Sequence, residues 1–141
     1  MSMKKLFVIA ILVQSVLIGK AQSEDKPFRA YIYNKEYEVY IRMDLYDESI
    51  TIPGQDLYGH LPGYLGKNNN TFCWVITSAE ITGSTAKLSM INDYGSEDLT
   101  AKLTIKDSLY VLKQIEGSTL KVPKNGKWQK LPKTLEFKRR H

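Results

Sequence analysis

The sequence predicts an all-β domain, an antiparallel meander of about eight to ten strands that forms a barrel or a sandwich and is preceded by a signal peptide. Apolar and polar residues alternate with a period of two over most of the chain, and turn residues separate these runs at short intervals. No run of comparable length has helical spacing after the N-terminal segment. Short connections make neighbouring strands antiparallel, and a closed or two-layered sheet exposes fewer strand edges.

The first 21 residues have the features of an export signal. Lys4 and Lys5 precede an apolar run from Leu6 to Val13, and small residues end this segment at Ala21. Gln14 and Ser15 interrupt the apolar run, which is shorter than the roughly 20 residues that a membrane span requires. We therefore expect cleavage after Ala21, a periplasmic or secreted product, and no transmembrane segment in the mature form.

The remaining chain divides into a polar leader, residues 22–27, and one β domain, residues 28–141. The whole chain has 141 residues, of which 43% are hydrophobic and 25% are charged, a composition typical of one globular domain. The clearest alternation lies within 36–46, and Asn125-Gly126 predicts a two-residue type I′ hairpin. The predicted strands, in order, are 28–34, 36–46, 48–52, 71–82, 84–92, 98–106, 109–116, 118–122, 126–130 and 134–139.

Residues 53–70 break the alternation. They contain four glycines, two prolines and three asparagines, together with several apolar side chains. Such a segment is typical of a packed loop or of a functional one. Two interpretations remain open: structural cover over one end of a barrel, or a recognition loop.

Tyrosines supply the candidate binding residues. The chain has nine of them, and tyrosine offers rigid amphipathic contact area at interfaces, although it also covers sheets for structural reasons. Tyr58, His60 and Tyr64 lie in the segment 53–70. Tyr40 and Tyr46 fall on the polar face of the predicted strand 36–46, where they would form an exposed aromatic strip.

Motifs for catalysis or metal binding are not found in the sequence. The chain has one cysteine and two histidines, without metal-ligand spacing, and it has no phosphate-binding glycine loop. Cys73 lies in the apolar run Phe72–Ile76, which predicts a buried thiol rather than a nucleophile. We therefore expect no cofactor, no metal and no enzymatic activity.

Charge is distributed unevenly along the chain. Residues 121–141 contain eight Lys or Arg and one Glu, whereas residues 22–120 contain nine against fourteen acidic residues. An exported protein with an acidic body is a poor candidate for nucleic-acid binding. The basic segment is either a solvated hairpin that protects a sheet edge or a weak contact for an anionic surface.

The layout resembles small exported all-β proteins of Gram-negative bacteria, including lipocalin-like and inhibitor-like barrels. The resemblance is carried by Met3–Phe7 with Gly19–Gln22, by the meander from Phe28, and by the closing segment Leu135–Arg139. It implies an exported β-barrel and carries no functional residue.

The function that we expect is recognition of a protein or glycan partner. A barrel that binds a small lipid-like ligand in its interior is the alternative, and a hydrolase is a third hypothesis.

Overall fold

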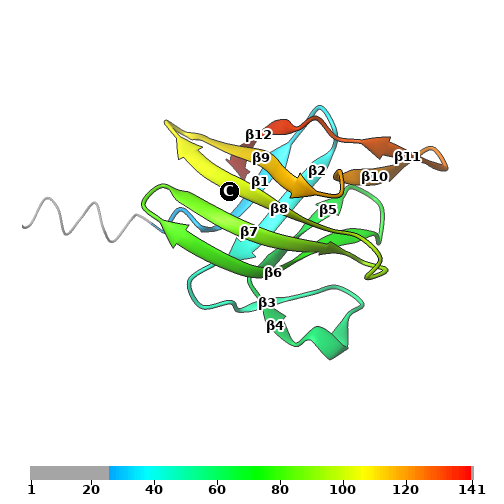
Figure 1. Cartoon of the computed structure of the whole chain (residues 1–141), viewed down its shortest axis with the longest axis horizontal. Helices are drawn as coiled ribbons and strands as arrows, with labels where there is room; N and C mark the ends of the chain where they lie inside the picture. The colour runs from blue at the N-terminus through cyan, green and yellow to red at the C-terminus, as the bar shows by residue number, and fades with distance from the viewer. Residues whose placement is uncertain (1–25, 141) are drawn as a thin grey trace, which may run out of the picture.

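Eight antiparallel strands close into a barrel in the computed structural model, which describes residues 26–140 (Figure 1). Each barrel strand pairs with the next one along the chain, and the last pairs with the first. This confirms the all-β meander and selects the barrel over the sandwich. The barrel strands are β1 (Arg29–Asn34), β2 (Val39–Asp44), β5 (Gly63–Lys67), β6 (Cys73–Thr82), β7 (Thr85–Asn92), β8 (Asp98–Lys106), β9 (Leu109–Gly117) and β12 (Thr134–Arg140).

The predicted export signal, residues 1–21, lies outside the described residues, as do residues 22–25 of the predicted leader. Within the described part of the chain, no helix has the length and apolar character needed to cross a membrane.

Alternation along the strands produces the core. In β2, Val39, Ile41 and Met43 point into the barrel and are at most 2% exposed, whereas Arg42 between them is exposed. The same pattern recurs around the barrel, where full burial of one large apolar side chain contributes roughly 1.5–3 kcal/mol. The largest members of this interior cluster are Trp74, Phe28, Phe137, Ile32, Ile41, Met43, Leu65, Ile76, Leu88, Met90 and Leu103.

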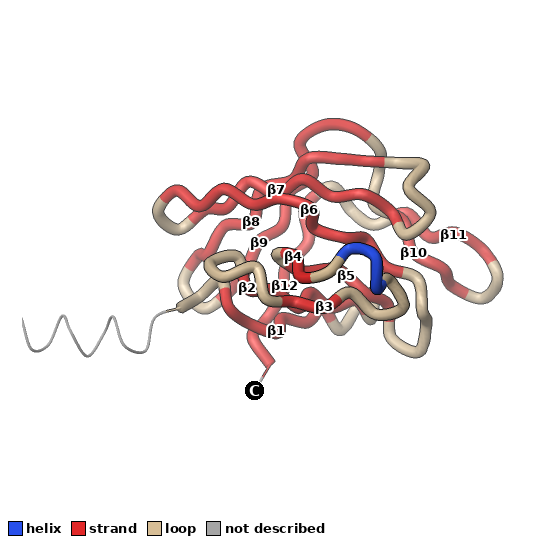
Figure 2. Tube along the Cα trace, turned by 90° about the horizontal axis from the view of Figure 1, so that it is seen from below, coloured by secondary structure: helices blue, strands red, loops and turns tan. Residues whose placement is uncertain are grey.

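An excursion between β2 and β5, which we call the flap, covers the outside of the wall (Figure 2). It consists of β3 (Ile50–Thr51), the 3-10 helix η1 (Asp56–Tyr58) and β4 (His60–Leu61). Ile52 of the flap is 1% exposed and belongs to a second apolar cluster with Tyr64, Cys73 and Val75 on the outer faces of β5 and β6. The flap therefore gives this part of the barrel a second layer.

The expectation of one continuous loop over 53–70 is wrong, because β5 of the barrel lies inside this segment and the flap covers the wall rather than a barrel end. Glycine composition concealed the strand. Gly66 pairs with Tyr40, whose ring lies across it, and a Cβ at Gly66 would come within 2.5 Å of Tyr40 Cζ. A glycine inside a strand often marks such a close approach.

The predicted strand 36–46 is too long, because β2 ends at Asp44. Asp44 Oδ1 accepts hydrogen bonds from the backbone nitrogens of Tyr46, at 3.2 Å, and Asp47, at 3.1 Å. This side-chain turn competes with the strand ladder and bends the chain away. Tyr46 is therefore not in one strip with Tyr40; its ring lies 6.5 Å from that of Phe28.

A second excursion, between β9 and β12, forms the hairpin of β10 (Lys121–Lys124) and β11 (Lys127–Lys130). Asn125 and Gly126 have φ values of 53° and 77°, so the turn has positive φ at both central residues, as type I′ requires. The predicted hairpin is confirmed. It projects beyond the barrel, at the right of Figure 1.

The second apolar cluster makes a stability prediction. Replacing Ile52 by alanine should leave a cavity under the flap and lower the free energy of unfolding by about 2–4 kcal/mol, measured by urea denaturation. Leu57→Ala is the matched control, because Leu57 belongs to the same flap but is fully exposed. Equal losses from the two substitutions would contradict a flap held by Ile52.

Candidate functional site

Aromatic and basic side chains gather on the outer face of β12, β1 and β2. Because Ile32 and Ile41 point inward, their neighbours along the strands point outward. The strand register places Tyr31 between Arg140 and Arg42, and Tyr33 between Lys138 and Tyr40. We call this surface the tyrosine–arginine face and define it by Tyr31, Tyr33, Tyr40, Arg42 and Arg140.

The rings of this face contact one another and the two guanidinium groups. Tyr31 and Tyr40 stack with their centroids 5.5 Å apart and their planes 14° apart. Arg42 Cζ lies 4.4 Å from the Tyr31 centroid, and Arg140 Cζ lies 5.1 Å from the Tyr33 centroid and 5.8 Å from that of Tyr31. A cation–π contact holds the guanidinium group near the ring and leaves N–H groups available for another partner.

No carboxylate among the described side chains forms an ion pair with these arginines. The ion pairs of the described residues join Arg29 to Asp44 and Asp47, and Lys121 to Glu97. Arg42 and Arg140 are both exposed and interact with tyrosine rings instead. The face therefore presents two oriented cations whose hydrogen-bond donors are open to an external anion.

An asparagine-rich turn after β5 borders the face. Asn68 Nδ2 donates a hydrogen bond of 3.0 Å to the Tyr33 hydroxyl, and the side chain of Lys67 is anchored by a 2.7 Å hydrogen bond from Nζ to the carbonyl of Tyr37. Two shallow hollows of about 570 and 580 Å³ share Tyr31, Arg42, Asn68 and Asn69 among their lining residues. Neither lining includes an Asp or Glu of the described chain.

Tyr64 of β5 supports the face from its side, on the neighbouring strand. Its ring meets that of Tyr40 edge-on, with a centroid separation of 5.9 Å and an interplanar angle of 78°. Tyr64 is only 6% exposed, and burial, together with the neighbouring Tyr40, raises its pKa to about 12. Tyr64 therefore has little surface to offer a partner, and it holds the position of Tyr40.

The five residues expected at a binding site do not form one cluster. Tyr40 belongs to the tyrosine–arginine face and touches Tyr64. Tyr58 and His60 are exposed on the flap, in η1 and β4. Tyr46 lies in the turn after β2, where its hydroxyl accepts a 3.0 Å hydrogen bond from the backbone nitrogen of Phe28.

Arg42 and Arg140 were not among the binding residues predicted from the sequence. Arg42 could have been found, because the alternation that puts Tyr40 on the polar face of β2 puts Arg42 there too. Arg140 could not, because it reaches Tyr31 and Tyr33 only through the closure of β12 onto β1.

Asp44 lies near the face and forms an ion pair with Arg29. Burial alone would raise the pKa of this carboxyl. Hydrogen bonds from Ser49 Oγ and the backbone of Asp47, together with the Arg29 guanidinium, lower it below the usual 3.8. Asp44 is therefore a stabilising carboxylate at neutral pH.

The thiol of Cys73 lies under the flap. Burial, with a further contribution from Asp93, raises the pKa of Cys73 to about 12, so the thiolate is scarce at neutral pH. Among the described residues, no group of three or more His, Cys, Asp or Glu side chains is placed to hold a metal ion.

Comparisons with family models, with curated proteins and with solved structures found no match to this chain.

Asp44 predicts an acid-dependent loss of stability. Because its pKa is lower in the folded than in the unfolded chain, its contribution is complete above 3.8 and disappears as the pH falls through the folded value. Asp44→Asn should lower the free energy of unfolding at neutral pH and flatten its decline in acid, measured by urea denaturation down to a pH of about 2. Asp47→Asn, at an exposed position, should change neither by much. An unchanged acid slope in Asp44→Asn would contradict this role.

The flap predicts slow modification of Cys73. A thiol reagent such as dithionitrobenzoate should react with the native protein far more slowly than with the urea-unfolded chain, because Cys73 is only 4% exposed. Ile52→Ala should accelerate the reaction by loosening the flap, and Leu57→Ala should not. Native and unfolded chains that react at one rate would show that the flap does not cover this thiol.

Proposed function

We propose that the protein is an exported binding protein that recognises an acidic glycan through the tyrosine–arginine face. The observation that carries the proposal is the pair of guanidinium groups, Arg42 and Arg140, which lie over tyrosine rings and form no ion pair with a described carboxylate side chain. A ligand that brings its own carboxylate, sulfate or phosphate groups supplies what these arginines lack.

The neighbouring polar groups favour a sugar over a simple ion. Asn69 and Asn70 are exposed beside Arg42, and amide side chains both donate hydrogen bonds to hydroxyls and accept them. The tyrosines add phenolic oxygens and apolar ring surface, which suits a ligand with both apolar and hydroxyl-bearing faces. The two hollows are shallow and adjoin one another, a shape that fits a stretch of polymer better than one small molecule.

The lipid-like ligand of the barrel interior has less support. Interior side chains from all eight barrel strands form one packed cluster. In small barrels of eight strands, side chains are sufficient to fill the interior. The exposed polar groups that could bind a ligand lie on the outside of the barrel, at the tyrosine–arginine face.

The part of the proposal that the protein is exported is supported by the N-terminal residues. Their basic start, apolar run and small-residue end support secretion or periplasmic delivery, where acidic surface glycans would be accessible.

The proposal predicts charge-specific binding to an acidic polysaccharide. Isothermal titration with polygalacturonate should show binding that Arg42→Ala together with Arg140→Ala weakens by about tenfold or more, since a hydrogen bond to a charged group contributes roughly 1.5–3 kcal/mol. Replacing both arginines by lysine keeps the charge but removes the planar fork, so it should restore only part of the affinity.

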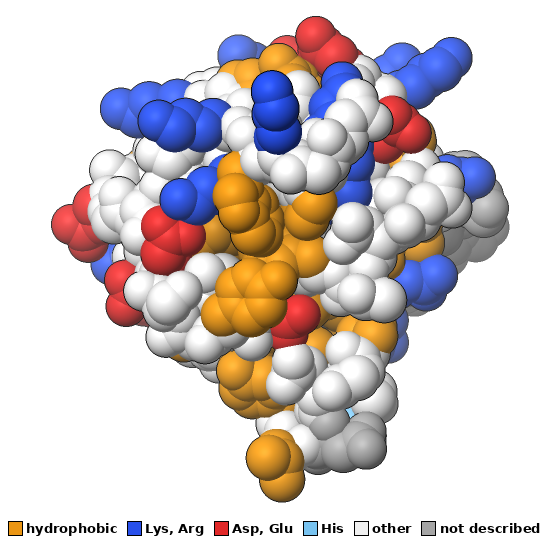
Figure 3. Space-filling view, turned by 90° about the vertical axis from the view of Figure 1, so that its right-hand side faces the viewer, with side chains coloured by type: hydrophobic (Ala, Val, Ile, Leu, Met, Phe, Trp, Pro, Cys, Tyr) orange, Lys and Arg blue, Asp and Glu red, His pale blue; other side chains and the backbone are white. Residues whose placement is uncertain are grey.

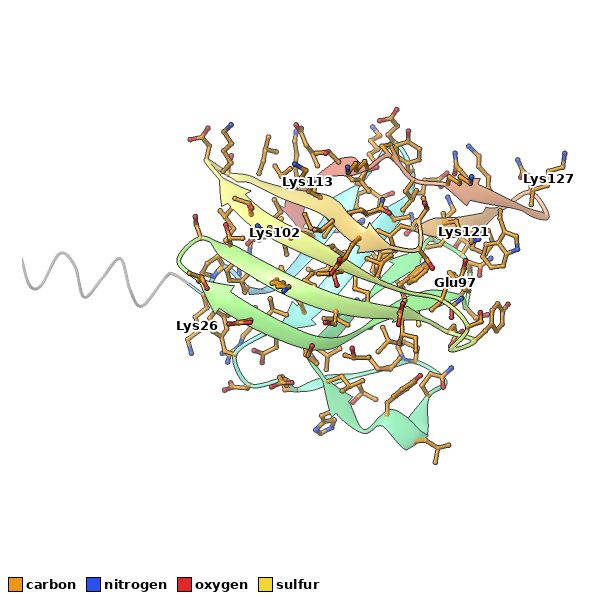
Figure 4. The ribbon with its side chains drawn as sticks, in the orientation of Figure 1. Lys26, Glu97, Lys102, Lys113, Lys121 and Lys127 are labelled. Atoms are coloured by element: carbon orange, nitrogen blue, oxygen red, sulfur yellow. The ribbon has the colours of Figure 1, made fainter. Side chains whose placement is uncertain are left out.

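The matched control is Lys102→Ala together with Lys113→Ala, which removes two positive charges from the opposed exposed pair on β8 and β9 (Figure 4). This variant should bind as the wild type does. Equal losses in the two double variants would mean nonspecific charge attraction and would contradict the proposal. Equal affinity for polyglutamate would favour an acidic protein partner instead, and binding of neutral dextran would exclude recognition through the arginines.

A further inference from the structure

Three connections meet at one end of the molecule: the β10–β11 hairpin, the turn between β7 and β8, and the part of the flap around η1. The rings of Trp128, in the hairpin, and Tyr94, in the turn, lie 6.4 Å apart. Gln55, next to η1, donates a side-chain hydrogen bond to Asp93 of the same turn. Figure 3 views this end, where hydrophobic side chains run from an upper edge bordered by basic side chains to the lower tip.

Exposed apolar side chains are concentrated here. Among the described residues, six large hydrophobic side chains are exposed, and four of them belong to these connections: Leu57, Tyr58, Tyr94 and Trp128. Tyr94 is 71% exposed and Trp128 is 50% exposed. A group of exposed apolar side chains is typical of a contact surface, whereas single exposed apolar residues are common on any protein.

The exposed rings are held in place. Phe72 is 6% exposed, and its ring lies 4.9 Å from that of Trp128 and 5.8 Å from that of Tyr94. Trp128 also pairs across the hairpin with Pro123. The indole is therefore presented by a fixed support, so little side-chain entropy would be lost when it is buried by a partner.

The hairpin beside these rings carries unbalanced positive charge. Lys121 pairs with Lys130 and Lys124 with Lys127 across the two strands, and like charges directly opposite destabilise a hairpin. Residues 117–135 contain no Asp or Glu. Glu97 neutralises Lys121, with a Nζ–Oε1 distance of 3.0 Å (Figure 4). The described residues form no ion pair with Lys124, Lys127 or Lys130.

We propose that this end of the protein docks on an anionic lipid bilayer, with Trp128 and Tyr94 at the interface and the hairpin lysines against the headgroups. Tryptophan and tyrosine prefer the membrane–water interface, and lysine side chains reach headgroups while their stems lie along apolar surface. Charge complementarity selects anionic lipid, because each juxtamembrane lysine adds attraction to such a surface. The apolar groups stand on three separate turns, which suits insertion between headgroups.

This inference is independent of the tyrosine–arginine face, which lies on β12, β1 and β2. The two tryptophans provide a local probe, because Trp74 is fully buried in the barrel and only Trp128 can change its surroundings on docking. Vesicles of phosphatidylglycerol mixed with phosphatidylcholine should shift the emission of Trp128 to shorter wavelength. Brominated lipids in the same vesicles should quench it.

The variants separate charge from apolar contact. Lys124→Glu together with Lys127→Glu should weaken the vesicle affinity by about tenfold or more, as should high salt. Tyr94→Ala should weaken it while leaving the salt dependence. Lys102→Glu together with Lys113→Glu is the matched charge control and should retain the shift in tryptophan emission. Trp128→Phe should abolish this shift, because it removes the reporting indole. All variants are compared in the same form of the chain, so differences between them report on the substituted side chains.

Three results would overturn the proposal: an unchanged Trp128 emission with anionic vesicles, an equal shift with phosphatidylcholine alone, or a shift with soluble heparin but none with vesicles. The hairpin variants should titrate polygalacturonate as the wild type does, so failure of this test and failure of glycan binding are distinguishable.

Discussion

Three residue pairs join β1 to β12: Tyr31 with Arg140, Ile32 with Arg139, and Tyr33 with Lys138. This pairing removes the two free edges that an eight-stranded meander would otherwise expose, and it lets Ile32 and the inward side chains of β12 close the core. The same pairing carries Arg140 from the end of the chain onto the rings of Tyr31 and Tyr33. The core and the tyrosine–arginine face therefore depend on the same register between β1 and β12. A slip of one residue would move the inward side chains of one strand to the outer face and its outward side chains into the core.

The flap adds a second constraint on the neighbouring wall. By burying Tyr64, Cys73 and Val75, it converts the outer face of β5 and β6 into a small core. Tyr64 then supports Tyr40, whose ring fills the space that the missing side chain of Gly66 leaves. Of the predicted segment 53–70, Asn68 and Asn69 border the candidate site directly, whereas the flap contributes to it only indirectly, through the position of Tyr40. Its exposed tip instead belongs to the end of the molecule where Tyr94 and Trp128 lie.

Local patterns predicted most of the barrel and only part of the site. The alternation in β2, the turn at Asn125-Gly126 and the apolar run around Cys73 depend on neighbours in the chain, and all three are observed. What was missed depends on distant contacts or on side-chain turns. The glycines of β5 are typical of a loop in the sequence, and only the structure shows that the Tyr40 ring occupies the space beside Gly66. The side-chain hydrogen bonds of Asp44 end β2 before Tyr46. The pairing of Arg140 with Tyr31 requires the closure itself.

The closure of the barrel is tested most directly by a nuclear Overhauser experiment on the isotopically labelled protein. The structure predicts cross-strand backbone contacts between Ile32 and Arg139, and contacts from the Tyr31 ring to the side chains of both Arg42 and Arg140. Contacts of β12 with β9 alone, with none to β1, would show an open sheet. In that case neither the core nor the tyrosine–arginine face described above would exist.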